Sequence, residues 1–294
     1  MLKAGVAGAG VFGGHHARKY ASLAGVRLAA VYDQDRSRAE ALAAGLGAEA
    51  FDDLAAFLKA VDAVTVATPA DSHADVAAAV LAAGRHAYVE KPLAVFRGDA
   101  TALVETAREK GLTLAVGHQE RVVFEAMGLL SAPERPSRIE AVRLGTPSPR
   151  NRDVSCVLDL MIHDLDLAIA LNGEVAKVEA EGVYDDATAE IGFANGAVAR
   201  FRASRIAGER SRTMRLDYPG GPVAIDFLAP SFSNQAGFPL DAGFASTPAG
   251  QDPLGTSVAA FVAAIAGQGR PAVSGAEGAR AVDVALRIES ALGL

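Results

Sequence analysis

Short apolar runs alternate with longer segments of helical periodicity over the first 120 residues. Such runs are typical of buried strands, and the segments between them, two of which stop at Gly84 and Gly111, are typical of helices. This alternation predicts an α/β domain with a doubly wound parallel sheet and helices on both faces. The expected strands are Lys3–Ala7, Arg27–Tyr32, Ala63–Ala67, His86–Val89 and Leu112–Val116, and the expected helices are Gly14–Leu23, Arg36–Leu46, Ser72–Ala83 and Asp99–Lys110.

The pattern changes after residue 120, where strand-like runs follow one another with turn signals such as "ANG" and "PGG" between them. Consecutive strands without helices between them predict an open, mostly antiparallel sheet. A helix is expected near Val154–Leu171, a long loop over 229–255, and two closing helices near 256–266 and 276–291. We therefore expect a first domain over 1–120 and a second α/β domain over 121–294. The expected strands of the second domain are Arg138–Leu144, Val175–Tyr184, Ala187–Phe193, Ala197–Arg205, Arg212–Tyr218 and Pro222–Phe227.

Composition narrows the class of protein. The formal net charge of −7 and the pI near 5.4 disfavour nucleic-acid binding. The single cysteine, Cys156, cannot form an intrachain disulfide, which fits a reducing compartment. The chain starts directly with a strand-like segment, and its alanine-rich runs are too short to span a bilayer. We expect a cytoplasmic protein that is not bound to a membrane.

A glycine-rich turn follows the first expected strand and opens a helix. In "GVAGAGVFGG" the glycines Gly8, Gly10 and Gly13 have the G-x-G-x-x-G spacing that brings backbone N–H groups close to a pyrophosphate. Val11 and Phe12 lie inside the same turn. Asp33 ends the second strand, where an acid binds ribose hydroxyls and repels a 2′-phosphate. The sequence therefore predicts NAD binding in preference to NADP, although the nearby Arg36 and Arg38 weaken that preference.

Two further loops follow strands of the same sheet. Thr68 and Pro69 end one strand, and His73 follows in the first turn of the next helix, as a surface or capping residue rather than a catalyst. Glu90 and Lys91 precede Pro92 after another strand. The carboxyl ends of parallel strands face the ligand crevice in such folds, so we expect both loops to contact the cofactor. A solvated turn is the alternative for Glu90-Lys91-Pro92.

The segment "VLDLMIHDLDLAIAL" has the apolar content of a buried helix but carries four ionisable residues. Asp159 and His163 are four residues apart and share one helix face, which Asp166 continues. His163 suits general-base chemistry because its charge changes near neutral pH. Asp164 and Asp166 have a purely structural alternative, as caps or partners of arginine. A metal site at Asp159, His163 and Asp166 is disfavoured because the sequence supplies few further ligands.

These motifs occur together in an order that resembles the Gfo/Idh/MocA family of nicotinamide-dependent sugar and cyclitol oxidoreductases. The matching elements are Gly8-x-Gly10-x-x-Gly13, Thr68-Pro69, Glu90-Lys91-Pro92 and Asp159-x-x-x-His163. The resemblance implies a Rossmann domain, an α/β domain whose open sheet mediates oligomerisation, and a catalytic set of Lys91, Asp159 and His163. It leaves open whether His163 or Lys91 accepts the proton.

Within that family, "GHQERV" and "RNRDVSCVLDLMIHDLDL" resemble bacterial UDP-N-acetylglucosamine 3-dehydrogenases. The basic loop ahead of the helix offers Arg150 and Arg152 as a clamp for an anionic substrate group, alongside Lys91, Asp159 and His163. A surface loop paired with local acids is the alternative. The resemblance implies oxidation of a sugar 3-hydroxyl for a later aminotransferase, in a homodimer or homotetramer. The alternatives are a dehydrogenase of a free sugar, inositol or sugar acid, and a non-catalytic NAD-binding sensor.

Overall fold

The computed structural model describes residues 1–147 and 153–294 and divides into two compact units. The first unit contains Met1–Gln119 and Leu254–Ala279, and the second contains Glu120–Pro253 and Arg280–Leu294. The domain boundary that we expected at residue 120 would place residues 254–279 in the second domain. The structure packs this stretch with the first unit instead, because it supplies apolar side chains to the first sheet.

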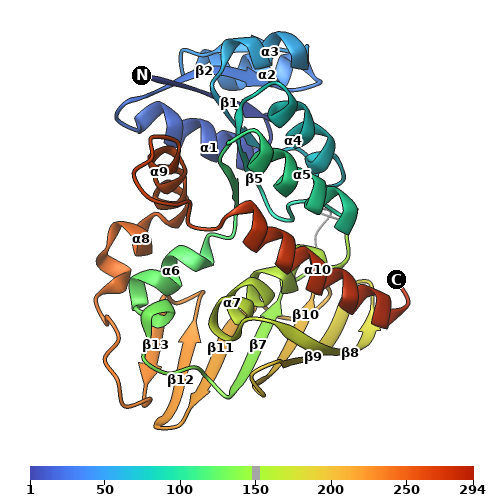
Figure 1. Cartoon of the computed structure of the whole chain (residues 1–294), viewed down its shortest axis with the longest axis vertical. Helices are drawn as coiled ribbons and strands as arrows, with labels where there is room; N and C mark the ends of the chain where they lie inside the picture. Colours follow the sequence, from blue (N-terminus) through green and yellow to red (C-terminus); the bar gives the residue numbers. More distant parts are fainter. Residues whose placement is uncertain (148–152) are drawn as a thin grey trace. The chain divides into compact units, whose positions relative to one another are not determined.

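The first unit is built on a six-stranded parallel sheet in the order β3-β2-β1-β4-β5-β6, of which Figure 1 labels β1, β2 and β5. This is the order of a dinucleotide-binding Rossmann sheet, so the expected doubly wound architecture is confirmed. The strands are β1 (Leu2–Ala7), β2 (Val26–Tyr32), β3 (Glu49–Phe51), β4 (Ala63–Val66), β5 (His86–Val89) and β6 (Leu114–Val116), and the helices between them are α1 (Val11–Ser22), α2 (Arg36–Ala44), α3 (Leu54–Ala60), α4 (His73–Ala82) and α5 (Arg97–Glu109).

Two elements of this unit, β3 and α3, were not expected from the sequence. The strand is short and half exposed, so it carries little apolar signal. Helix α9 (Pro253–Ile265) covers part of the sheet, where Phe261 packs edge-on against Tyr88 at 5.7 Å between ring centroids. Val258 is fully buried in the cluster that also contains Val6 and Tyr20. Burial of these side chains holds the late helix in the first unit.

The second unit is built on a seven-stranded sheet in the order β13-β12-β11-β7-β10-β9-β8. Neighbouring strands are antiparallel except β7 and β10, which run parallel, so the expected mostly antiparallel sheet is confirmed. The strands are β7 (Arg138–Leu144), β8 (Val175–Val183), β9 (Asp186–Phe193), β10 (Val198–Ser204), β11 (Ser211–Tyr218), β12 (Gly221–Asp226) and β13 (Ser231–Asn234).

The helices of the second unit differ from expectation in three places. An unexpected helix, α6 (Glu120–Met127), opens the unit. The expected helix at 154–171 begins with a π-helical turn, Val157–Met161, and continues as α7 (Ile162–Asn172). The region expected to be a long loop contains β13 and the short α8 (Pro248–Gln251), and α10 (Gly275–Leu292) follows near the C-terminus. Short polar elements of this kind lack the periodicity by which a sequence reveals them.

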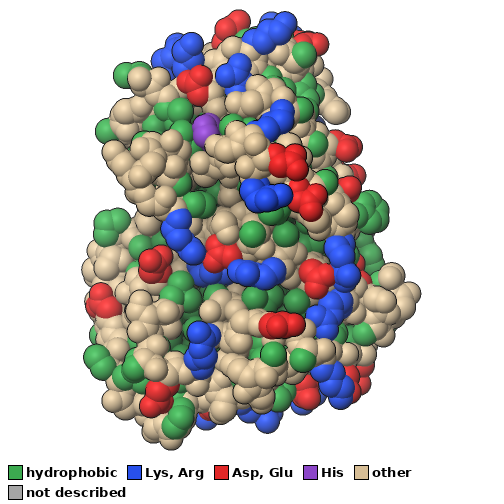
Figure 2. Space-filling view, in the orientation of Figure 1, with side chains coloured by type: hydrophobic (Ala, Val, Ile, Leu, Met, Phe, Trp, Pro, Cys, Tyr) green, Lys and Arg blue, Asp and Glu red, His purple; other side chains and the backbone are tan. Residues whose placement is uncertain are grey.

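The surface carries both signs of charge. Figure 2 shows Lys and Arg side chains interspersed with Asp and Glu over the face in view. Such mixing does not provide the extended basic stripe that nucleic acid requires. Within the described parts of the chain, every helix is too short or too polar to cross a membrane.

Candidate active site

The glycine turn of the first unit is shaped by close backbone packing. Gly8 has φ +99°, and a Cβ atom there would lie 2.5 Å from the Ala67 carbonyl oxygen. A Cβ atom on Gly13 would lie 1.7 Å from the Gly8 carbonyl oxygen. A Cβ atom on Gly10, by contrast, would meet no atom within 4 Å. The outer glycines thus allow the tight turn, and the middle one leaves its backbone open to a ligand.

Helix α1 begins directly after this turn without a capping side chain. Gly10 is its N-cap, and its first turn holds Val11 and Phe12 but no acid. Both side chains are exposed, Val11 to 64% and Phe12 to 42%. The first N–H groups of the helix therefore lack a side-chain partner, and the positive end of the helix dipole favours an anion there. These features fit the pyrophosphate of NAD.

The carboxylate of Asp33 is fixed beside the glycine turn by backbone amides. Oδ2 accepts a hydrogen bond from the Ala9 amide at 2.8 Å, and Oδ1 accepts one from the Asp35 amide at 2.9 Å. The nearby arginines are engaged elsewhere: Arg36 pairs with Glu40 and Asp52, and Arg38 lies 3.4 Å from an Asp35 oxygen. The arrangement favours ribose hydroxyls over a 2′-phosphate.

The loop after β4 contains an orphaned hydroxyl. Thr68 Oγ1 is buried and has no hydrogen-bond partner among the described residues. Buried hydroxyls rarely remain unsatisfied, so this atom suits a polar group of a bound ligand. Pro69 follows it and is exposed. The unsatisfied hydroxyl of Thr68 and the open backbone at Gly10 are both suited to a bound dinucleotide.

His73 is buried, so the expectation of a surface residue is wrong. Its Nδ1 lies 2.7 Å from the Pro92 carbonyl oxygen and its Nε2 lies 2.9 Å from the Thr68 carbonyl oxygen. Burial lowers the pKa of His73 despite these contacts. The ring connects the two loops that follow β4 and β5. We therefore propose that His73 belongs to the cofactor site, because it holds these loops together.

Glu90 is a buried carboxylate that ends β5, just before Lys91. Its Oε1 lies 2.7 Å from Nε2 of the fully buried His16 and accepts a longer hydrogen bond, 3.4 Å, from Gln119. Burial alone would raise the pKa of Glu90, but the His16 contact and the charge of Lys91 lower it overall. A Cβ atom on Gly117 would lie 2.8 Å from Glu90 Oε2, so a side chain there would displace this carboxylate. Lys91 itself is half-buried.

In the second unit, Asp159 lies in the π-helical turn and His163 is the second residue of α7. The turn is capped by Ser155, whose Oγ accepts hydrogen bonds from the Val157 and Leu158 amides. Turns of this type insert an extra residue into a helix and occur often at functional sites. The expectation of a regular helix through Asp159 is therefore wrong, although both residues belong to one continuous helical segment.

His163 contacts the ionisable side chain of Glu120, at the start of α6. Glu120 Oε2 lies 2.8 Å from His163 Nδ1, and its Oε1 accepts a hydrogen bond from Arg143 at 3.0 Å. Burial would raise the pKa of Glu120, but the charges of His163 and Arg143 hold it well below its usual range. The carboxylate is therefore ionised and can only accept, so Nδ1 donates to it. Sequence analysis did not identify Glu120.

Arg143 is the hub of this network. Its guanidinium also donates to both carboxylate oxygens of Asp164, at 2.9 and 2.8 Å. Burial disfavours its charge, yet Asp164 and Glu120 raise the pKa of Arg143 overall. Two residues later, Asp166 forms a similarly buried two-point pair with Arg121, at 3.0 and 2.6 Å. The structural alternative for these two aspartates, pairing with arginine, is confirmed.

Asp159 has a different basic neighbour. Arg205, which follows β10, lies 3.8 Å from Asp159 Oδ2 and 2.6 Å from Asp185 Oδ1. Its guanidinium also lies 5.4 Å from the ring centroid of Tyr184. Asp159 therefore carries a guanidinium neighbour that sequence reasoning missed, because Arg205 ends an ordinary strand pattern.

The expected anion clamp, Arg150 and Arg152, lies outside the described residues. Over the described ranges, no cluster of three or more His, Cys, Asp or Glu side chains could hold a metal ion. Cys156 is buried, and burial raises the pKa of its thiol to about 12, so it is unsuited to thiolate chemistry.

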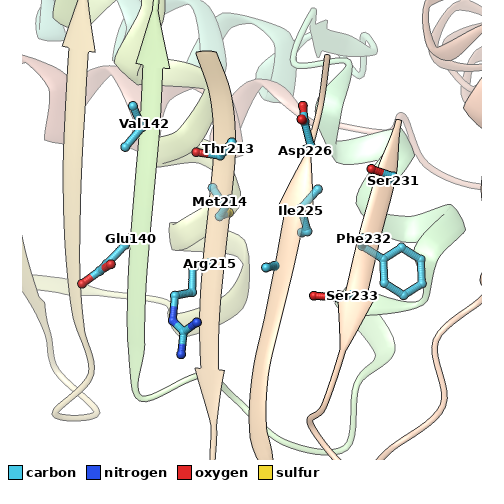
Figure 3. Close-up of a pocket in the computed structure, with 11 residues that line it drawn as sticks. Glu140, Val142, Thr213, Met214, Arg215, Ile225, Asp226, Ser231, Phe232 and Ser233 are labelled. Atoms are coloured by element: carbon cyan, nitrogen blue, oxygen red, sulfur yellow. The ribbon is translucent and has the colours of Figure 1, made fainter. Parts of the chain in front are cut away.

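A hollow of about 540 Å³ lies on the other face of the second sheet. Figure 3 shows side chains of β7, β11, β12 and β13 around it, including Glu140, Thr213 and Arg215. These positions alternate with the buried positions Ala141 and Leu216, which face the helices. The hollow is therefore separate from the face that carries His163.

Cofactor preference can be tested at Asp33. We expect the wild-type protein to bind NAD more tightly than NADP, and Asp33→Ala to reduce the ratio of the two affinities about tenfold or more, because a charge-assisted hydrogen bond and a repulsion are both lost. Calorimetric titration of both nucleotides measures the ratio, with the exposed Glu49→Ala as a charge-matched control. A wild-type preference for NADP would refute the assignment.

Comparison with known proteins gives consistent matches. Residues 2–118 match the model of the oxidoreductase family with an NAD-binding Rossmann fold, GFO_IDH_MocA. UDP-N-acetylglucosamine 3-dehydrogenase of Acidithiobacillus ferrooxidans is 36% identical over 306 aligned residues, which cover 99% of this chain and 97% of that protein. An inositol 2-dehydrogenase of Streptomyces avermitilis is 33% identical over 59% of the chain and 54% of its own length.

Solved structures agree. A structure of the Acidithiobacillus ferrooxidans enzyme has a TM-score of 0.89 at 35% identity, with 99% of this chain and 97% of that chain covered. The WlbA dehydrogenase of Bordetella pertussis, solved with NADH and UDP-GlcNAcA, has a TM-score of 0.88 at 20% identity over 99% and 95% of the chains, which supports the shared fold. The glycine turn, the Rossmann strand order and the near full-length similarity lead to one conclusion: the chain belongs to the Gfo/Idh/MocA family of NAD-binding oxidoreductases.

Proposed function

We propose that this protein is an NAD-dependent dehydrogenase that oxidises the 3-hydroxyl of UDP-N-acetylglucosamine. The observation that carries the proposal is the 36% identity to an enzyme of that name across 99% of the chain. The geometry of His163 supports it, because an imidazole held by an ionised carboxylate is equipped to accept a hydroxyl proton.

The roles of the residues follow from their contacts. When bound, NAD supplies a nicotinamide ring that accepts hydride. Nδ1 of His163 donates to Glu120, which selects the tautomer with the lone pair on Nε2, and we assign proton acceptance to that atom. Lys91 supplies positive charge that stabilises the developing alkoxide. Asp159 accepts a hydrogen bond from the sugar or orients the imidazole.

Several further features belong to the same proposal. The product, a 3-keto sugar nucleotide, suits an aminotransferase that installs a 3-amino group.

The outer face of the second sheet, with its hollow, suits self-association into a homodimer or homotetramer. We place the reaction in the cytoplasm, where a lone buried cysteine stays reduced. Arg150 and Arg152 remain predicted contacts of the substrate's diphosphate.

Turnover with a panel of substrates tests the proposal. We expect NADH formation from UDP-N-acetylglucosamine, and His163→Ala and Lys91→Ala should each lower kcat by about 10²-fold or more, since acid–base or electrostatic assistance is lost. NAD binding, measured separately, should be nearly unchanged. If free N-acetylglucosamine or inositol is oxidised and the sugar nucleotide is not, the substrate assignment is wrong. If no substrate is turned over, a sensor is favoured.

The pH dependence of oxidation tests the partnership of Glu120 and His163. Activity should rise with pH as the general base loses its proton, and an ionised neighbour favours the protonated ring. Glu120→Gln should therefore move this limb of the kcat/KM profile to lower pH, by about one to three units, with a lower plateau. Glu125→Gln, an exposed change on the same helix, is the matched control. An unchanged midpoint in Glu120→Gln would exclude the assigned role.

A further inference from the structure

A second arginine lies directly opposite the buried Arg143 and differs from it in its surroundings. Arg212 is the second residue of β11 and pairs with Arg143 across the β11–β7 ladder. It shares its sheet face with Met214 and Leu216, which are buried under the helices. Arg212 is itself half-buried, so its guanidinium is attached to the face that carries the His163 network.

The two opposed arginines are not neutralised equally. Arg143 is bonded to Glu120 and Asp164. Arg212, in contrast, makes no ion pair with any acidic side chain that the structure describes, and residues 148–152 contain no acid in their sequence. Burial lowers the pKa of Arg212, and the positive charge of Arg143 lowers it further, while the charges of Glu120 and Asp164 offset only part of this shift.

Such an arrangement is costly for the folded protein. Like charges directly opposite in a sheet destabilise it, and a charge withdrawn from water without a partner costs more. Other arginines near this end of the sheet are balanced: Arg121 pairs with Asp166, and Arg205 with Asp185. Arg212 is thus a positive site open to an anion, and its cross-strand neighbour Arg143 bonds the carboxylate that holds His163.

We propose that Arg212 binds the diphosphate of the sugar nucleotide and so anchors the substrate beside His163. The inference rests on the proposed function, because the diphosphate is the anionic group of UDP-N-acetylglucosamine. A guanidinium matches phosphate oxygens with two parallel hydrogen bonds, which an ammonium cannot do.

Arg212→Gln is the central test, with Arg215→Gln as its control. Arg215 lies on the same strand but on the opposite face, where it pairs with Asp217, so the control removes the same charge. UDP and uridine, which lacks phosphate, are titrated into each protein by calorimetry. We expect Arg212→Gln to weaken UDP binding roughly ten- to a hundredfold, to leave uridine and NAD binding unchanged, and to raise KM for the sugar nucleotide similarly. Arg212→Lys should recover only part of the loss.

Thermal unfolding without ligand gives an independent readout. Because Arg212 forms no ion pair within the described protein, Arg212→Gln should unfold at the same or a higher temperature than the wild type. UDP should raise the unfolding temperature of the wild type more than that of the variant. A variant that fails to fold, or unfolds at a lower temperature, would show that the fold needs this charge and would overturn the proposal.

The outcomes separate this inference from the proposed function. If the wild type oxidises UDP-N-acetylglucosamine but Arg212→Gln binds UDP as tightly as before, the role of Arg212 is wrong and the function stands. If the wild type neither binds UDP nor oxidises the sugar nucleotide, both are wrong. An equal loss of UDP binding in Arg215→Gln would point to net charge alone and would also overturn the assignment.

Discussion

A buried guanidinium between two carboxylates determines how the second unit is organised. Arg143, on a central strand, is only 2% exposed and bonds Glu120 at the start of α6 and Asp164 in α7. Removing one partner from such a buried group costs about 3–5 kcal/mol, because the remaining charge is left uncompensated. The network therefore holds two helices to the sheet at fixed positions. It also explains why an otherwise apolar helix tolerates several aspartates.

The same network connects stability to chemistry. Glu120 helps to neutralise Arg143 and also contacts His163. The ion pair with Arg143 therefore fixes the carboxylate that orients the general base. Arg143 in turn keeps Glu120 ionised, which fixes that carboxylate as an acceptor. The neighbouring Arg212 forms no ion pair with these carboxylates in the described structure, although their negative charge partly offsets the repulsion from Arg143. At this end of the sheet, Arg143 is paired with two carboxylates and stabilises the fold. Arg212 has no ion-pair partner among the described residues and, in our proposal, binds the anionic ligand.

Sequence patterns were sufficient for the parts of the protein that obey simple periodicity. The parallel sheet around the Gly8–Gly13 turn follows from the alternation of strands and helices, and the long strands of the second sheet follow from their alternating burial. The π-helical turn at Asp159 has no such signal, since its apolar content equals that of an α-helix. Glu120 was missed because its partners, His163 and Arg143, are distant in sequence.

Tertiary packing accounts for the remaining differences. His73 has the polarity of a surface residue, but in the interior its two ring nitrogens lie within hydrogen-bond distance of backbone carbonyls from separate loops. Residues 254–279 follow the second domain in sequence yet supply Phe261 to the first sheet. Neither contact leaves a pattern in the local sequence.

The one clue to Glu120 was its place beside Arg121 at the start of an amphipathic segment, "ERVVFEAM", between a strand and a turn.

The transfer of hydrogen from the sugar's C3 to the cofactor is the central claim, and isotopic labelling measures it directly. The protein is incubated with NAD and UDP-N-acetylglucosamine that carries deuterium at C3, and the reduced cofactor is analysed by mass spectrometry. The account predicts NADH with one deuterium on the nicotinamide ring and a 3-keto sugar nucleotide. NADH without deuterium, or reduction of NAD only by a free sugar or an inositol, would contradict it.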